Sequence, residues 1–138
     1  MNKMVSYKFD ATLEALGTAL DPVMDELDIL GVDKKIAYKI RLALDEILTN
    51  VVSYAYEDEE GEVEVNYEIQ DDPRMIVVNV IDEGKAFNPL EIEDPDLTLD
   101  IQDRQIGGLG LFIVKNTMDD VSYVRDNNKN ILTIKKLI

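Results

Sequence analysis

Two polar residues on a segment with an apolar stripe carry the first chemical signal in this sequence. Glu46 and Asn50 are four residues apart, so on a helix they project from the same side. The stripe centres near Ile47, which places both side chains near the edge of the buried face. A carboxylate and an amide at this spacing can hold a hydrated Mg²⁺, which takes oxygen ligands and keeps waters. A solvated Glu–Asn pair is the alternative, and the pair taken alone favours it.

A second signal follows a nearly all-apolar stretch over residues 75–81. Asp82 comes directly after that stretch, and Gly84 stands two residues further on. A carboxylate at a strand end, followed by glycine, can face a ligand that approaches the bare backbone. The same pattern also makes an ordinary turn, and on its own it favours the turn.

Three glycines, Gly107, Gly108 and Gly110, precede a short helical pattern. Glycines at a helix start leave backbone N–H groups free to bind phosphate, and the helix dipole favours the anion. The pattern is not a Walker A motif, because no Gly-Lys-Ser/Thr follows. It is not a Rossmann fingerprint either, because an acidic loop rather than a strand precedes it. A flexible entry to the helix is the alternative, at even weight.

The helices that would position these residues are predicted from apolar periodicity. Helical spacing predicts a first helix that is capped by Asp10, kinked or broken at Pro22 and closed by Gly31. It also predicts a second helix of about 20 residues, capped by Asp33 and carrying the Glu–Asn pair. A third, short helix follows the glycines.

The strands are predicted from alternation and turn residues. They are expected at residues 4–9, 63–69, 75–81, 121–124 and 131–134, with a hairpin turn at 126–130. Between Asp82 and Gly110 the periodicity fails, and such long loops in small domains are commonly functional. The order β-α-α-β-β-loop-α-β-β predicts an α+β two-layer sandwich, with a mixed, mostly antiparallel sheet and helices on one face.

Composition excludes several other kinds of chemistry. The 138 residues predict one domain, residues 1–138, and contain no Cys and no His. Thiol nucleophiles, zinc fingers, Ser-His-Asp triads and phospho-accepting histidines are therefore excluded. The net charge of −15 argues against direct nucleic-acid binding and fits a basic protein partner. No apolar run reaches membrane-spanning length and no signal peptide is visible, which predicts a cytoplasmic protein with no membrane partner.

The three motifs, in this order, resemble those of the GHKL, or Bergerat-fold, ATP-binding superfamily. The N box matches residues 44–50 and continues through Ala55 and Tyr56, the G1 box matches 82–89, and the G2 box matches 107–111. Within the superfamily the chain is most similar to the small bacterial anti-sigma factor serine/threonine kinases. Asp-x-Gly-x-x-Phe-x-Pro and Gly-Gly-x-Gly-Leu-x-Ile/Leu-Val-Lys are typical of that branch. The resemblance covers nearly the whole chain.

The resemblance implies a role for each motif. Asn50 would bind Mg²⁺, and Glu46 would act as general base toward the nucleophile. Asp82 would accept a hydrogen bond from the adenine amino group, and Gly84 would let the ring approach. Further nucleotide-binding residues that it implies are Ala86, Phe87, Gly107, Gly108, Leu109, Gly110, Leu111 and Thr133.

An ATP lid is implied over about residues 87–106. Arg104 is the only Arg or Lys between Lys85 and the three glycines. We expect it to approach the γ-phosphate when the lid closes, where positive charge stabilises the transferring group.

The resemblance implies a kinase that uses Mg²⁺ and ATP and phosphorylates a STAS-type anti-anti-sigma protein on Ser or Thr. The same protein would sequester a sigma factor, as a homodimer, and could hold ATP or ADP. A nucleotide-gated binding regulator without phosphoryl transfer is the alternative, and only the kinase needs Glu46 as a base. The catalytic domain of a histidine kinase is a weaker third reading, because the phospho-acceptor would have to be a separate protein.

Overall fold

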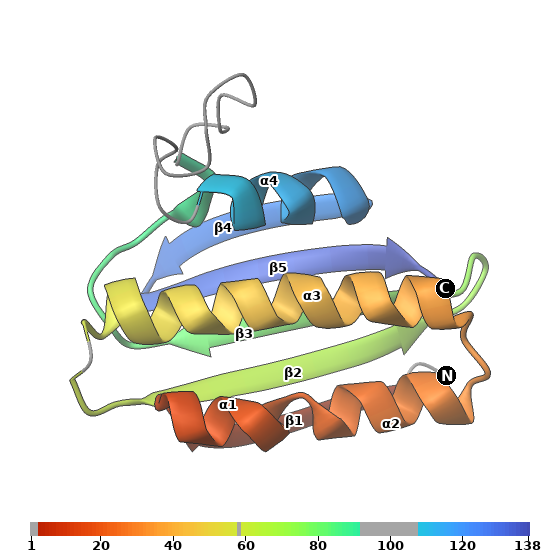
Figure 1. Cartoon of the computed structure of the whole chain (residues 1–138), viewed down its shortest axis with the longest axis horizontal. Coiled ribbons are helices and arrows are strands. Elements are labelled where there is room, and N and C mark those ends of the chain that lie inside the picture. The colour runs from red at the N-terminus through yellow and green to blue at the C-terminus, as the bar shows by residue number, and fades with distance from the viewer. Residues whose placement is uncertain (1–2, 58, 92–107) are drawn as a thin grey trace.

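The computed structural model of the chain describes residues 3–57, 59–91 and 108–138, and it shows one sheet with helices on one face (Figure 1). The helices are α1 (Leu13–Ala19), α2 (Asp21–Ile29), α3 (Lys34–Asn50) and α4 (Gly108–Thr117). The strands are β1 (Lys3–Asp10), β2 (Glu62–Gln70), β3 (Met75–Asp82), β4 (Asp120–Asp126) and β5 (Lys129–Leu137). A π-helical turn, η1 (Val51–Ala55), continues α3, and a 3₁₀ turn, η2 (Pro89–Glu91), follows β3. The predicted α+β two-layer sandwich is confirmed.

The strand order of the sheet is β1-β2-β3-β5-β4. All four pairings between the described strands are antiparallel, so the parallel component of the predicted mixed sheet is not found among them. In the central pairing Asp82 of β3 lies opposite Asn130 of β5. This register places the end of β3 beside the start of β5.

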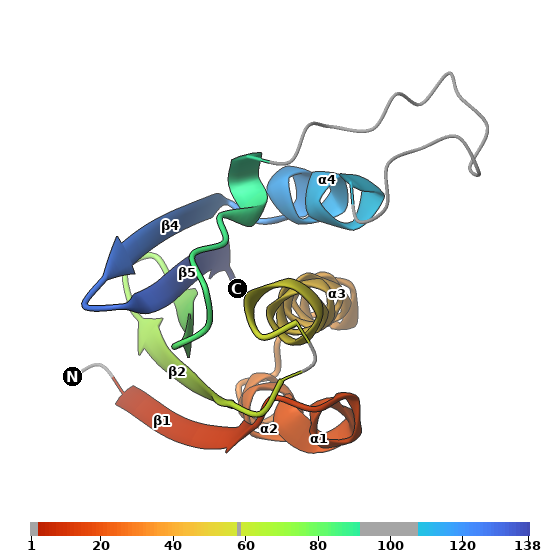
Figure 2. The same ribbon diagram turned by 90° about the vertical axis from the view of Figure 1, so that its left-hand side faces the viewer.

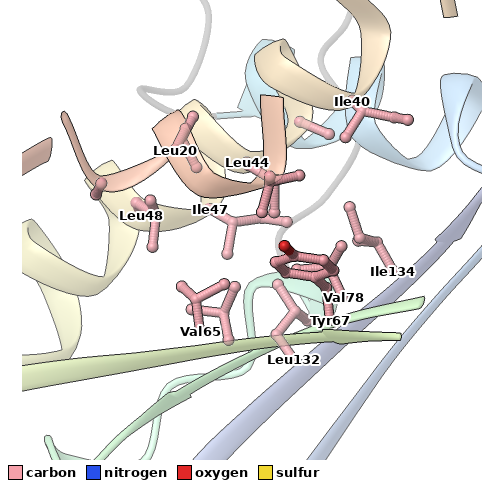
Figure 3. Packing of buried hydrophobic residues seen from close by; sticks show 14 of the residues in the cluster. Leu20, Ile40, Leu44, Ile47, Leu48, Val65, Tyr67, Val78, Leu132 and Ile134 are labelled. Carbon is pink, nitrogen blue, oxygen red and sulfur yellow. The ribbon is translucent and has the colours of Figure 1, made fainter. Parts of the chain in front are cut away.

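The core lies between the sheet and the helices, with α3 across the middle (Figure 2). The apolar stripe of α3 packs against alternate residues of β2, β3 and β5, as Figure 3 shows for Leu44, Ile47, Val65, Val78 and Leu132. Burying each such side chain contributes about 1.5–3 kcal/mol. The stripe thereby determines which side of α3 faces the sheet and, with it, where Glu46 and Asn50 point.

Local capping explains where the helices begin and end. Asp10 does not cap the first helix, because it is the last residue of β1; the hydroxyl of Thr12 accepts from the Ala15 N–H instead. The predicted break is confirmed, since Pro22 lies in the first turn of α2, where its missing N–H costs no helical bond. The Asp33 carboxylate caps α3 through the Lys35 N–H, as predicted.

None of the described helices is long and apolar enough to span a membrane.

Candidate functional site

The carboxylate of Glu46 lies against the first turn of α4. Helices α3 and α4 pack side by side, as Figure 1 shows. A Cβ atom built on Gly110 would lie 2.2 Å from Cδ of Glu46 and 2.3 Å and 2.5 Å from its oxygens. Only glycine therefore leaves room for the carboxylate in this position. The structure thus places the carboxylate of Glu46, one member of the predicted Glu–Asn pair, directly against Gly110, one of the three glycines.

Asn50 stands next to this carboxylate with an unsatisfied donor. Its side chain is 5% exposed, and its Nδ2 has no hydrogen-bond partner among the described residues. An unpaired buried amide costs about 1–3 kcal/mol, so this group is available to a ligand. Rotating the amide by half a turn presents its oxygen in the same place. Asn50 therefore fits the expected metal ligand.

Burial raises the pKa of Glu46 above its ordinary value, and the nearby Asn50 amide opposes part of that rise. The native fold thus disfavours the charged form of Glu46.

Glu46→Gln is expected to stabilise the protein more at neutral pH than at acid pH. The folded pKa of Glu46 is raised, so the penalty for its charge is absent below the unfolded pKa and grows as pH rises through the folded pKa. Denaturant unfolding of both proteins from about pH 4 to about pH 8 should show a difference that increases with pH and then levels off above the folded pKa. A pH-independent difference would contradict the assigned burial of the charge.

Asp82 presents one carboxylate oxygen as an acceptor at the end of β3. The side chain is 4% exposed, and its Oδ1 accepts from the Gly84 N–H at 2.9 Å and from Asn130 Nδ2 at 2.8 Å. Burial raises the pKa of Asp82, while these two bonds and the charge of Arg125 oppose the rise. No described residue donates to Oδ2, which is left for a ligand.

The turn after β3 is anchored on η1. A Cβ on Gly84 would lie 2.5 Å from the carbonyl oxygen of Ala55, and the Lys85 N–H donates to the same oxygen at 2.9 Å. The Tyr56 hydroxyl accepts from the Glu83 N–H and donates to the Glu62 carbonyl. Glycine at position 84 is therefore required by contact with the protein itself. That it also admits an adenine ring stays a prediction.

A narrow pocket lies between α3 and the sheet, and the polar groups of Asn50, Asp82 and Asn130 meet in it. Its apolar lining consists of Ile47, Val51, Val80, Phe87, Pro89, Tyr123 and Leu132. The cavity volume is about 20 Å³, enough for one water, whereas ligand pockets usually reach about 300–1,000 Å³. Phe87, which lines the pocket, stacks on Tyr54 with ring centroids 5.1 Å apart.

A larger hollow of about 370 Å³ opens on the other face of the sheet, between Lys8, Glu64, Ile81 and Lys129. Its lining is mostly charged and exposed, and it does not include Asn50, whose buried Nδ2 has no partner in the described part of the chain. We therefore place the candidate site at the narrow pocket, where buried polar groups converge.

The remaining predicted site residues divide into three groups. Ala86 is exposed beside the pocket and does not line it, while Leu111 is buried in α4 at 1% exposure. Gly108 and Leu109 form the start of α4. Arg104 and Gly107, with most of the expected lid, lie outside the described residues.

Thr133 is not at the site. Its neighbours Leu132 and Ile134 face the helices, so Thr133 points to the opposite face, where its hydroxyl donates to Asn79 Oδ1 at 2.6 Å. Asn130 lies in the pocket instead, although its position in the sequence indicated only a hairpin turn. The strand register that pairs it with Asp82 is the signal that would have found it.

Over residues 9–136 the chain matches the family described as the histidine kinase-like ATPase domain, and it belongs to that family. The resemblance inferred from the three motifs is therefore confirmed.

Its relatives narrow the class further. The chain is 36% identical to serine-protein kinase RsbW of Listeria monocytogenes over 101 residues, which are 70% of this chain and 63% of that protein. It is 26% identical to the anti-sigma F factor of Clostridium acetobutylicum over 132 residues, 91% of this chain and 79% of that protein. It is 28% identical to serine/threonine-protein kinase BtrW of Bordetella bronchiseptica over 100 residues, 72% of this chain and 70% of that protein.

The fold also matches a solved structure. The crystal structure of the RsbU and RsbW domains of a Mycobacterium tuberculosis protein superposes with a TM-score of 0.68 at 18% identity. The match covers 98% of this chain and 32% of that one. It shows a shared fold.

Proposed function

We propose that this protein is an ATP-dependent serine/threonine-protein kinase and anti-sigma regulator. The observation that carries the proposal is the Glu46 carboxylate against the first turn of α4, beside the unpaired amide of Asn50. The names of the relatives, serine-protein kinase and anti-sigma F factor, support the same function.

Each group of the site has a chemical task in this proposal. Asp82 Oδ2 accepts from the adenine amino group, and the backbone N–H groups at the start of α4 hold phosphate oxygens. Asn50 would hold Mg²⁺ through its amide oxygen, together with phosphate oxygens. The metal would neutralise phosphate charge. Glu46 accepts the proton of the attacking hydroxyl, and its raised pKa brings it closer to the optimum of a general base.

We propose a STAS-type anti-anti-sigma protein as the acceptor and a sigma factor as the sequestered partner. The net charge of −15 suits a basic protein surface and opposes direct contact with nucleic acid. A homodimer in the cytoplasm is part of the same proposal, which rests on similarity to the anti-sigma kinases. Arg104 of the lid is proposed to approach the γ-phosphate.

A nucleotide-gated binding regulator is the second candidate, and the narrow pocket is compatible with it as with the kinase. A cavity of about 20 Å³ must widen before a nucleoside enters, and Phe87 and Pro89 line the side that leads to the lid. Nucleotide binding would then be coupled to movement of this segment, whether or not phosphoryl transfer follows.

Phosphoryl transfer separates the two candidates. The purified protein, γ-labelled ATP and Mg²⁺ are added to lysate from a host strain that lacks the gene. A small labelled protein should appear with wild type, and Glu46→Gln should reduce its labelling by about 10²–10⁴-fold with nucleotide affinity unchanged. Phosphopeptide mapping then names the acceptor.

The matched control is Asp45→Asn, because Asp45 is the neighbouring acid on α3, about half exposed and paired only loosely with Arg41 at 4.0 Å. The Asp45→Asn variant should label the acceptor protein as strongly as wild type does. No labelling by wild type, with nucleotide binding intact, would leave the binding regulator as the function.

A further inference from the structure

The buried side chain of Asn130 connects four parts of the site. It is 4% exposed, and its Nδ2 donates to Asp82 Oδ1 and to the Lys85 carbonyl, both at 2.8 Å. Its Oδ1 accepts from the Phe87 N–H at 3.3 Å and from the Tyr123 hydroxyl. The side chain therefore ties the end of β3 and the turn after it to β4 and β5.

These four contacts determine the orientation of the amide. Both neighbours of Nδ2 are acceptors, and both neighbours of Oδ1 are donors. A rotation of the amide by half a turn would set its oxygen against two acceptors, Asp82 Oδ1 and the Lys85 carbonyl, and its NH₂ group against the Phe87 N–H. All the hydrogen-bonding capacity of the side chain is used, so Asn130 has no freedom to serve a ligand directly.

These contacts determine which carboxylate oxygen of Asp82 can accept a hydrogen bond from a ligand. Its Oδ1 is occupied by Asn130 and by the Gly84 N–H, so Oδ2 is the oxygen that remains to accept from a ligand. The Asn130 donor also favours the ionised carboxylate, which can accept but not donate. A purine with an amino group at position 6 satisfies that oxygen, and a purine with a carbonyl oxygen there repels it.

We propose that Asn130 is the positioning residue that makes this site select adenine over a 6-oxopurine. The proposal rests on nucleotide binding as proposed above, and it adds the residue that sets base specificity. Asn130 acts through Asp82 and does not touch the base.

Asn130→Asp is the informative change because it preserves size and both acceptor contacts. It replaces the Nδ2 donor by a second carboxylate oxygen facing Asp82 Oδ1. Two carboxylates this close share a proton, which lowers the negative charge on Asp82 and makes its Oδ2 a weaker acceptor. Affinity for ATP should therefore fall more than affinity for ITP, which carries a carbonyl oxygen at position 6.

The test measures equilibrium binding of ATP and of ITP to the purified full chain by calorimetry. Wild type should prefer ATP by at least about a hundredfold, as expected where a buried acceptor is left unpaired by the analogue. Asn130→Asp should reduce that preference at least about tenfold. Asn130→Ala removes the donor without adding charge and should reduce the preference for ATP less. This second variant tests the proposal if Asn130→Asp does not fold.

Asn79→Asp is the matched control. Asn79 lies on the other face of β3, where its amide donates to Asn66 and its oxygen accepts from Thr133. This variant makes the same chemical change in the same sheet, and the preference for ATP should stay as in wild type.

Each remaining outcome overturns the proposal in a distinct way. If Asn130→Asp weakens ATP and ITP equally, Asn130 only maintains the fold of the turn. If wild type binds ATP and ITP alike, Asp82 does not select the base. If wild type binds neither nucleotide, the proposed function itself fails, and the specificity proposal fails with it.

Discussion

Gly110→Ala is expected to lower phosphoryl transfer at least about a hundredfold while changing the free energy of unfolding by less than about 1 kcal/mol. The new methyl group would occupy the place of the Glu46 carboxylate, 2.2 Å from its Cδ. That carboxylate is the end of a flexible side chain, so it can rotate away at little cost. Alanine also suits a helix better than glycine. The transfer rate would thus fall because the Glu46 carboxylate is displaced and not because the fold is weakened. Measuring transfer rates and denaturant unfolding on the same variant separates the two effects.

The double variant Glu46→Gln with Gly110→Ala tests the cause. If Gly110→Ala acts by displacing Glu46, adding it to Glu46→Gln should reduce the rate little further. If the two reductions in transfer rate multiply in the double variant, Gly110 matters for another reason, such as phosphate binding. A fully active Gly110→Ala variant would remove Glu46 from the proposed role of base.

Gly84→Ala is expected to destabilise the fold by about 2–3 kcal/mol. Here the methyl group would meet backbone, 2.5 Å from the carbonyl oxygen and 2.7 Å from the carbonyl carbon of Ala55. Neither η1 nor the turn after β3 can yield without breaking the bond from the Lys85 N–H to that oxygen. Denaturant unfolding measures the loss, and nucleotide affinity should fall with it because Asp82 also bonds the Gly84 N–H.

Gly17→Ala is the control for both glycine variants. Gly17 lies in α1, and a Cβ there would meet nothing within 4 Å. Alanine should therefore stabilise the protein by about 0.5–1 kcal/mol. An unfolding free energy for Gly84→Ala that is equal to wild type would contradict the close contact with Ala55.

Local patterns alone were enough to predict most of the elements and two of the motifs. The apolar stripe of α3 and the alternation in β2 are repeated over several turns or residues, so the buried face is encoded in short segments. Glu46 and Asn50 share a helix, and Asp82 and Gly84 share a turn. Their relation follows from spacing within one element, and the family resemblance added their expected roles.

The caps were less predictable than the elements. Asp10 and Thr12 are both good capping residues, and only the pairing of Asp10 with Glu62 in the sheet decides that the strand extends through it. The face on which Thr133 lies was unpredictable for a related reason. The face of a strand residue depends on the register of its strand, and a shift by one residue reverses it.

Contacts between elements distant in the sequence were decided by the tertiary structure alone. Gly110 meets Glu46 because α4 docks on α3, and Asn130 meets Asp82 because β5 pairs with β3 in one register. Neither contact can be predicted from local periodicity, because periodicity indicates only which face of an element is buried. The sequence by itself therefore determined the elements, the fold class and the residue types of the site. The packing of α4 and the register of β5 decided which of those residues act on one another, because both depend on long-range contacts that form only when the whole sheet and its helices assemble.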